Sequence, residues 1–212
     1  MSLQKSFVMK LLLLTLAALV AFMAPDSVDP VMKAFSQKAS AYCVSFEYSF
    51  SGTRQGRPAF SGSGSAEVSG DAFRVEGNGM EISCDGTSRW VADHMAEEVV
   101  IEPVDPQSPD FLVNPALLIV YASDAFETVR TETGVFGGRN CRRVDLKPVV
   151  DAGVKSVSMF FDGDVPVGAK ICSSDGTEMV FNISNLAFSP LKEAPSYRPS
   201  GFPSSWVVTD LR

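Results

Sequence analysis

One ten-residue stretch, residues 42–51, alternates between large apolar and small or polar side chains, and it constrains the fold more than any other. The large apolar positions are Tyr42, Val44, Phe46, Tyr48 and Phe50. Side chains along a β-strand point alternately to the two faces of a sheet, so a period of two collects these five on one face. The stretch therefore predicts a strand with a continuous aromatic surface on one side.

The next predicted strand continues the same face with smaller side chains. After a turn over residues 52–58, the two-residue period resumes at Phe60, Gly62, Gly64, Ala66 and Val68. Glycine and alanine at inward positions either admit something bulky or allow the sheet to bend sharply. Both interpretations are open from the sequence.

Further strands follow along the chain, separated by turn residues such as Asp85-Gly86, Asp162-Gly163 and Asp175-Gly176. They are expected near residues 73–75, 80–84, 90, 97–104, 126–132, 140–146, 154–161, 167–172, 177–185 and 206–209. Strands and helices do not alternate in the way that a parallel sheet requires, so we expect an antiparallel sheet. The predicted fold is mainly β with short α-helices, in the form of an open, strongly curved sheet or incomplete barrel.

Two short helices are predicted. Asp29 is a good N-cap and Pro30 suits the first helical position, so one helix begins there and presents Phe35 on its apolar stripe. The other covers residues 116–122, which are apolar almost all round. A surface helix would have a polar face, so this helix is expected to be covered on most sides.

The N-terminus resembles a secretory signal. Met9-Lys10 precedes an uncharged apolar run over residues 11–24, which is shorter than the about 20 residues of a membrane span. We interpret residues 1–24 as a signal peptide with an upstream extension, and residues 25–212 as a single domain. An uncleaved membrane anchor is the alternative.

Charge and cysteine content narrow the function classes. The chain has a formal net charge of −7, and an acidic surface repels phosphate, so nucleic acid is not expected as a partner. In an oxidising compartment the four cysteines could form disulfides in three different pairings, and the sequence does not choose among them. They are Cys43, Cys84, Cys141 and Cys172.

No constellation for catalysis or metal binding is evident. His94 is the single histidine and lies beside a predicted turn. Asp162-Gly163-Asp164 resembles the start of a calcium loop, but Ser173 stands where a bidentate acid is needed. We therefore predict a non-enzymatic protein with no catalytic residue, no metal site and no cofactor.

The remaining candidate is apolar surface. Several large side chains share the predicted inner face, and they could form either a packed core or the wall of a ligand cavity. They are Phe46, Phe50, Phe60, Phe73, Met80, Ile82 and Trp90. The small residues at 62, 64 and 66 favour a concave face that is partly unfilled.

From residue 29 to residue 210 the chain resembles the LolA family, the periplasmic carriers of outer-membrane lipoproteins. The similar motifs are the glycine-spaced strand 62–68, a Phe-x-Trp-like strand at Phe73 to Val75, and a hairpin from Asp85 to Trp90. The segments 175–181 and 197–201 also fit in order and spacing.

The resemblance implies an unclosed half-barrel with a helical lid across its open side. Phe73, Val75 and Ile82 would then line the cavity, as part of the inner face described above. The residues that would belong to the lid are Phe35, Leu117, Leu118 and Tyr121. Ser69 stands where well-known family members have an arginine that locks the lid, so gating or cargo is expected to differ.

The implied function is that of a monomeric carrier in the periplasm of a Gram-negative bacterium. It would bind the acyl chains of lipoproteins, receive them from an inner-membrane lipoprotein-releasing transporter and pass them to an outer-membrane acceptor. Two alternatives are a regulatory or envelope-sensing binding domain on the same fold, and a shuttle of free lipid or glycolipid.

Overall fold

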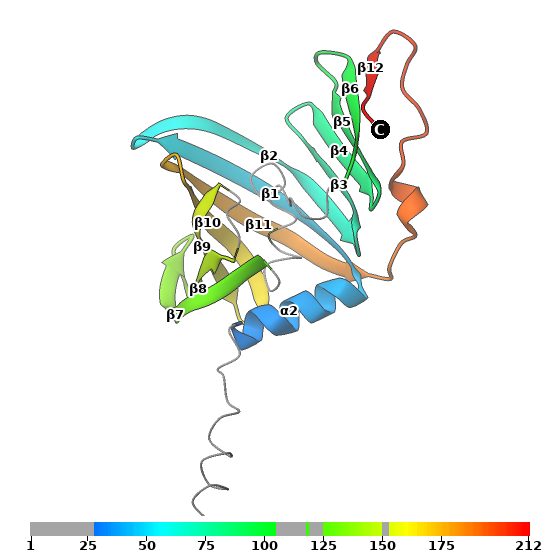
Figure 1. The fold of residues 1–212 in the computed structure, drawn as a ribbon. Helices are drawn as coiled ribbons and strands as arrows, with labels where there is room; N and C mark the ends of the chain where they lie inside the picture. Colours follow the sequence, from blue (N-terminus) through cyan, green and yellow to red (C-terminus); the bar gives the residue numbers. More distant parts are fainter. Residues whose placement is uncertain (1–27, 105–117, 119–124, 150–152) are drawn as a thin grey trace, which may run out of the picture.

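The computed structural model describes residues 28–104, 118, 125–149 and 153–212 (Figure 1). The predicted signal peptide, and the predicted lid residues Leu117 and Tyr121, lie outside these residues. Among the described residues, no helix has the length and apolar character needed to cross a membrane.

The described strands form one sheet in the order β12-β6-β5-β4-β3-β2-β1-β11-β10-β9-β8-β7. In chain order they are β1 (Cys43–Arg54), β2 (Arg57–Ser69), β3 (Ala72–Gly77), β4 (Met80–Asp85), β5 (Ser88–Asp93), β6 (Glu98–Pro103), β7 (Phe126–Phe136), β8 (Arg139–Pro148), β9 (Val154–Asp162), β10 (Val165–Ser173), β11 (Thr177–Ser189) and β12 (Val207–Asp210). In the described part of the chain β12 and β7 do not pair, so the sheet is not closed. The predicted half-barrel is confirmed.

The antiparallel prediction is wrong at one edge, because β12 pairs with β6 in the parallel direction. Two neighbouring strands joined by a short hairpin must run in opposite directions, whereas a longer connection also permits parallel pairing. β12 is reached instead through a long tail after β11, which includes the short 3-10 helix η1 (Ala194–Tyr197).

Helix α2 (Pro30–Ala41) begins as predicted, with Asp29 as N-cap and proline at its start. Its buried side chains are Met32, Phe35, Ser36 and Ala39. Tyr42 was expected to open the aromatic row of β1, but it ends the helix and is 46% exposed. Of the second predicted helix the structure describes only Leu118, which is helical and buried.

On the concave face, β1 and β2 pair large side chains with small ones. Tyr48 lies opposite Gly64, Phe50 opposite Gly62, and Phe60 opposite Gly52. A Cβ atom on Gly62 would come 2.7 Å from Cζ of Phe50, and one on Gly52 would overlap the Phe60 ring. The glycines therefore accommodate rings from the neighbouring strand. The Phe60 ring packs over Gly52, and β1 continues through that glycine to Arg54. The turn between β1 and β2 is therefore shorter than the predicted turn over residues 52–58.

At Gly64 the backbone of the neighbouring strand comes very close. A Cβ atom there would overlap the carbonyl oxygen of Glu76 on β3, an atom of the backbone that cannot turn away. The absence of a side chain at Gly64 therefore permits the close approach of β3 at this point.

Gly64→Val is expected to lower the free energy of unfolding by about 3 kcal/mol, because it overpacks a backbone contact. For a chain of this length that corresponds to a fall in Tm of about 6–12 °C in a thermal melt. Ser65→Val is the matched control, since Ser65 is exposed on the other face and valine suits a strand. Equal Tm values for the two variants would contradict this account.

The main core lies on the concave face, where α2 packs on the sheet. It includes Met32 and Phe35 of the helix together with Val44, Val68 and Leu146 of the strands. Two smaller clusters lie on the opposite face, one around Trp90 and one around Phe136 and Phe160. The sheet therefore buries apolar side chains on both faces, with the larger share inside the curve.

Candidate functional site

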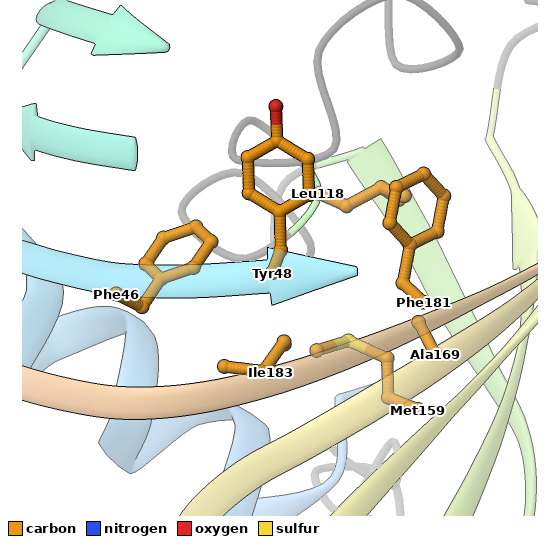
Figure 2. Close-up of a pocket in the computed structure, with 7 residues that line it drawn as sticks. All are labelled: Phe46, Tyr48, Leu118, Met159, Ala169, Phe181 and Ile183. Atoms are coloured by element: carbon orange, nitrogen blue, oxygen red, sulfur yellow. The ribbon is translucent and has the colours of Figure 1, made fainter. Parts of the chain in front are cut away.

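A small apolar pocket lies on the concave face, close to the middle of the sheet (Figure 2). Side chains of β1, β9, β10 and β11, together with Leu118, surround it. They are Phe46, Tyr48, Leu118, Met159, Ala169, Phe181 and Ile183. The hydroxyl of Tyr48 is the one polar side-chain atom in this set, so the pocket suits hydrocarbon.

The pocket is almost filled in the structure. Its free space is about 10 Å³, which is about what a single water molecule requires. Leu118 is the one described lining residue that does not belong to the sheet, and it is only 2% exposed. A fatty chain could enter only if this side chain moved away.

The predicted cavity residues of β1 and β2 lie in different environments. Phe46 lines the pocket, and Phe50 is half-buried with its ring centroid 5.6 Å from that of Phe181. Phe60 is 43% exposed and lies toward the hairpin tip, 6.2 Å from Phe50 between ring centroids. Phe46 is thus the one predicted cavity residue that the structure places at the pocket.

The predicted residues of β3 and β4 lie beside the pocket and do not line it. Phe73, Val75 and Ile82 are buried in the main core, and Met80 is half-buried at the start of β4. Trp90 lies on the opposite face, where Phe202 and Trp206 of the tail pack against its cluster. We therefore leave Trp90 out of the site.

Four lining residues in the second half of the chain were missed: Met159, Ala169, Phe181 and Ile183. The sequence carries a usable signal for part of this wall, because Met179, Phe181 and Ile183 also alternate with a period of two. Tyr48 was recognised as part of the aromatic row but was not singled out.

Helix α2 is fixed at its N-terminus to β7 and β8. One carboxylate oxygen of Asp29 accepts hydrogen bonds from Thr131 Oγ1 and Arg142 Nη2, both at 2.7 Å, and the other accepts from the Val31 N–H at 2.9 Å. Burial raises the pKa of Asp29, but these hydrogen bonds outweigh it and hold the pKa below its usual value. Near the middle of the helix, Phe35 meets Phe188 of β11 edge-on. The helix therefore spans one end of the curved sheet (Figure 1).

Ser69, at the position where the resemblance implies a lid-locking arginine, holds the C-terminal tail. Its hydroxyl accepts a hydrogen bond from the Lys192 N–H at 2.9 Å and donates one to the Lys192 carbonyl at 3.1 Å. Farther along the tail, Arg198 binds Asp85 of β4. Ser69 thus has a clear structural role away from the pocket.

The structure places the cysteines and the single histidine that the sequence analysis considered. All four cysteines are free, and Cys43 Sγ lies 3.7 Å from the Tyr197 hydroxyl. His94 lies half-exposed, with its Nε2 3.6 Å from a carboxylate oxygen of Glu81. Within the described ranges, no group of three or more His, Cys, Asp or Glu side chains could hold a metal ion.

No protein-family model matches the chain, and no curated protein matches it either. Among solved structures, an uncharacterized conserved protein from Thermus thermophilus is similar over 85% of this chain and 96% of its own, with 12% identity and a TM-score of 0.52. That likeness shows a shared fold.

Two further structures are similar at lower scores. A DUF1329 family protein from Desulfovibrio piger is 11% identical, with 82% and 96% of the two chains covered and a TM-score of 0.46. A LolA superfamily protein from Nitrosomonas europaea is 9% identical, with 80% and 96% covered and a TM-score of 0.44.

Proposed function

We propose that this protein is a periplasmic carrier that binds the acyl chains of lipoproteins on the concave face of its open sheet. The observation that supports the proposal is the pocket itself. Among the described residues its lining is apolar except for one hydroxyl, and Leu118, which lies outside the sheet, packs into it. Such a site can hold hydrocarbon and can close when hydrocarbon leaves.

Transfer energies explain why a carrier is needed. Each buried methylene is worth about 0.8 kcal/mol, so leaving a chain of about 14 methylenes in water costs roughly 11 kcal/mol. A lipid-modified polypeptide therefore does not cross an aqueous compartment unaided. The carrier must bind the chain, yet no more tightly than the membrane that receives it. A pocket whose described lining has no charged side chain suits that balance.

An acyl chain can enter the pocket only if the Leu118 side chain moves out of it. The free space of about 10 Å³ admits no acyl chain, so the incoming chain would replace the leucine side chain against Met159, Ala169 and Phe181. This exchange of one apolar group for another costs little, because both states keep the pocket dry. The other predicted lid residues, Leu117 and Tyr121, lie outside the described part of the chain.

In the proposed cycle the protein acts as a monomer without a cofactor and without catalysis. It would accept acylated polypeptide from an inner-membrane transporter and release it to an outer-membrane acceptor, after export through the signal at residues 1–24. A shuttle of free lipid or glycolipid would use the same pocket, and the identity of the bound molecule distinguishes the two.

The proposal is tested by incubating the protein with phospholipid vesicles that carry a triacylated polypeptide and then sedimenting the vesicles. We expect the polypeptide to appear in the supernatant in complex with the protein. Ala169→Phe, whose ring would take the place proposed for the acyl chain, is expected to reduce this transfer at least tenfold. Lys170→Phe on the opposite face is the control and is expected to behave as wild type. Polypeptide that stays with the vesicles, or equal transfer by both variants, would contradict the proposal.

A further inference from the structure

The hydroxyl of Tyr48 stands at one end of the pocket. The ring rises from β1 between Phe46 and Phe181, and the oxygen points away from Met159 and Ile183 (Figure 2). A fatty chain that lay along the apolar wall would therefore have this oxygen near its end. That is where a chain stops being hydrocarbon and joins its polar linkage.

Among the residues that the structure describes, the hydroxyl has only a weak partner. Tyr48 is 9% exposed, and its oxygen lies 3.5 Å from the carbonyl oxygen of Glu76, to which it donates. Good O–H···O hydrogen bonds are close to 2.7–2.8 Å, so this contact is near the limit of the interaction. A buried hydroxyl with a poor partner gains free energy from a better acceptor.

Three strands build the position of this oxygen. A Cβ atom on Gly64 of β2 would come 2.7 Å from it, and one on Gly77 of β3 would come 3.1 Å from it. Glycine at both places leaves the hydroxyl the space that it occupies. Burial raises the pKa of Tyr48, which keeps the group protonated and therefore a donor at ordinary pH.

We propose that the Tyr48 hydroxyl is a specificity-determining group that donates a hydrogen bond to the ester carbonyl oxygen of a bound acyl chain. The ligand class is thereby narrowed to acyl esters, and ether-linked chains of the same length lose this bond. The hydroxyl would turn from the Glu76 carbonyl to the ligand, which fixes how deep the chain enters. This inference rests on the proposed function, because it assumes that acyl chains occupy the pocket.

The test compares the affinity for a diacyl phospholipid with that for its dialkyl ether analogue of equal chain length. Each lipid is titrated against wild type and against Tyr48→Phe, and binding is measured by displacement of a fluorescent fatty-chain probe. Loss of one hydrogen bond predicts that Tyr48→Phe weakens binding of the ester about 3- to 10-fold and changes binding of the ether less than twofold. Tyr42→Phe is the control, because Tyr42 is exposed away from the pocket. It is expected to leave both affinities unchanged.

The outcomes separate the two proposals. Equal weakening of ester and ether, or no change in either, overturns the role of the hydroxyl and leaves the carrier function standing. Failure of wild type to bind either lipid and the fluorescent fatty-chain probe overturns the proposed acyl-chain pocket, and the role of Tyr48 falls with it. A preference for the ester that disappears in Tyr48→Phe supports both.

Discussion

Replacing Asp85 with alanine is expected to destabilise the protein by about 3 kcal/mol and to release the C-terminal tail. One oxygen of this buried carboxylate accepts from the Thr87 and Ser88 N–H groups, at 2.9 and 2.8 Å, and from Thr87 Oγ1. The other oxygen binds Arg198. Alanine would leave these donors without their acceptor, next to the fully buried Tyr197 of the tail.

Thermal unfolding and limited proteolysis check this expectation. A fall in Tm of about 6–12 °C and early cleavage between residues 190 and 206 are expected for Asp85→Ala. Asp175→Ala is a close control, because Asp175 caps a second turn with the same sequence, Asp-Gly-Thr, but is exposed. It is expected to change Tm and tail cleavage far less. If both variants behave alike, the tail is not held through Asp85.

The same carboxylate makes stability depend on pH. Burial raises the pKa of Asp85, but its hydrogen bonds from Ser88, Thr87 and Arg198 outweigh that effect and hold the pKa far below its usual value. The stabilisation is therefore complete above the unfolded pKa of about 4 and is lost as the pH falls below it, by up to about 1.4 kcal/mol per pH unit. The stability gap between wild type and Asp85→Asn should be widest above pH 5 and narrow toward pH 2.

Leu118→Ala is expected to change stability and ligand affinity in opposite directions. Truncating a buried leucine costs about 2–5 kcal/mol, because it leaves a cavity in the empty protein. The same cavity favours an incoming chain, which no longer competes with the leucine side chain. We expect the affinity for a fatty-chain probe to rise about tenfold, equivalent to about 1.4 kcal/mol.

Leu146→Ala separates this effect from a general loosening of the core. Leu146 is equally buried in the main cluster but does not line the pocket. It should lower Tm by a similar amount without raising affinity. A probe that binds Leu118→Ala no better than wild type would show that the leucine does not occupy the ligand's place.

The strands and the apolar face of β1 were predictable because they depend on local features. A period of two marks Val44, Phe46 and Tyr48 as inward, and glycine-containing turns mark the hairpins at Gly86 and Gly176. Asp29 and Pro30 marked the start of α2 in the same way. Each of these signals lies within a few residues of the feature that it specifies.

The composition of the pocket was harder to predict, because it depends on pairing between distant segments. Tyr48 lies beside Ile183 only because β1 pairs with β11, although these two strands are far apart in the sequence. Trp90 is misleading for a related reason. Side chains on both faces of β5 are at least partly buried, since the tail brings Phe202 and Trp206 to its outer face. Alternation alone does not reveal which face is concave.

The most direct test of the central claim is native mass spectrometry of the protein purified from the periplasm without detergent. We expect a population that carries the additional mass of an acylated polypeptide, and we expect Ala169→Phe to be recovered without it. Protein that is bare in every preparation, and stays bare after exposure to acylated polypeptide, would contradict the claim that this sheet carries fatty chains.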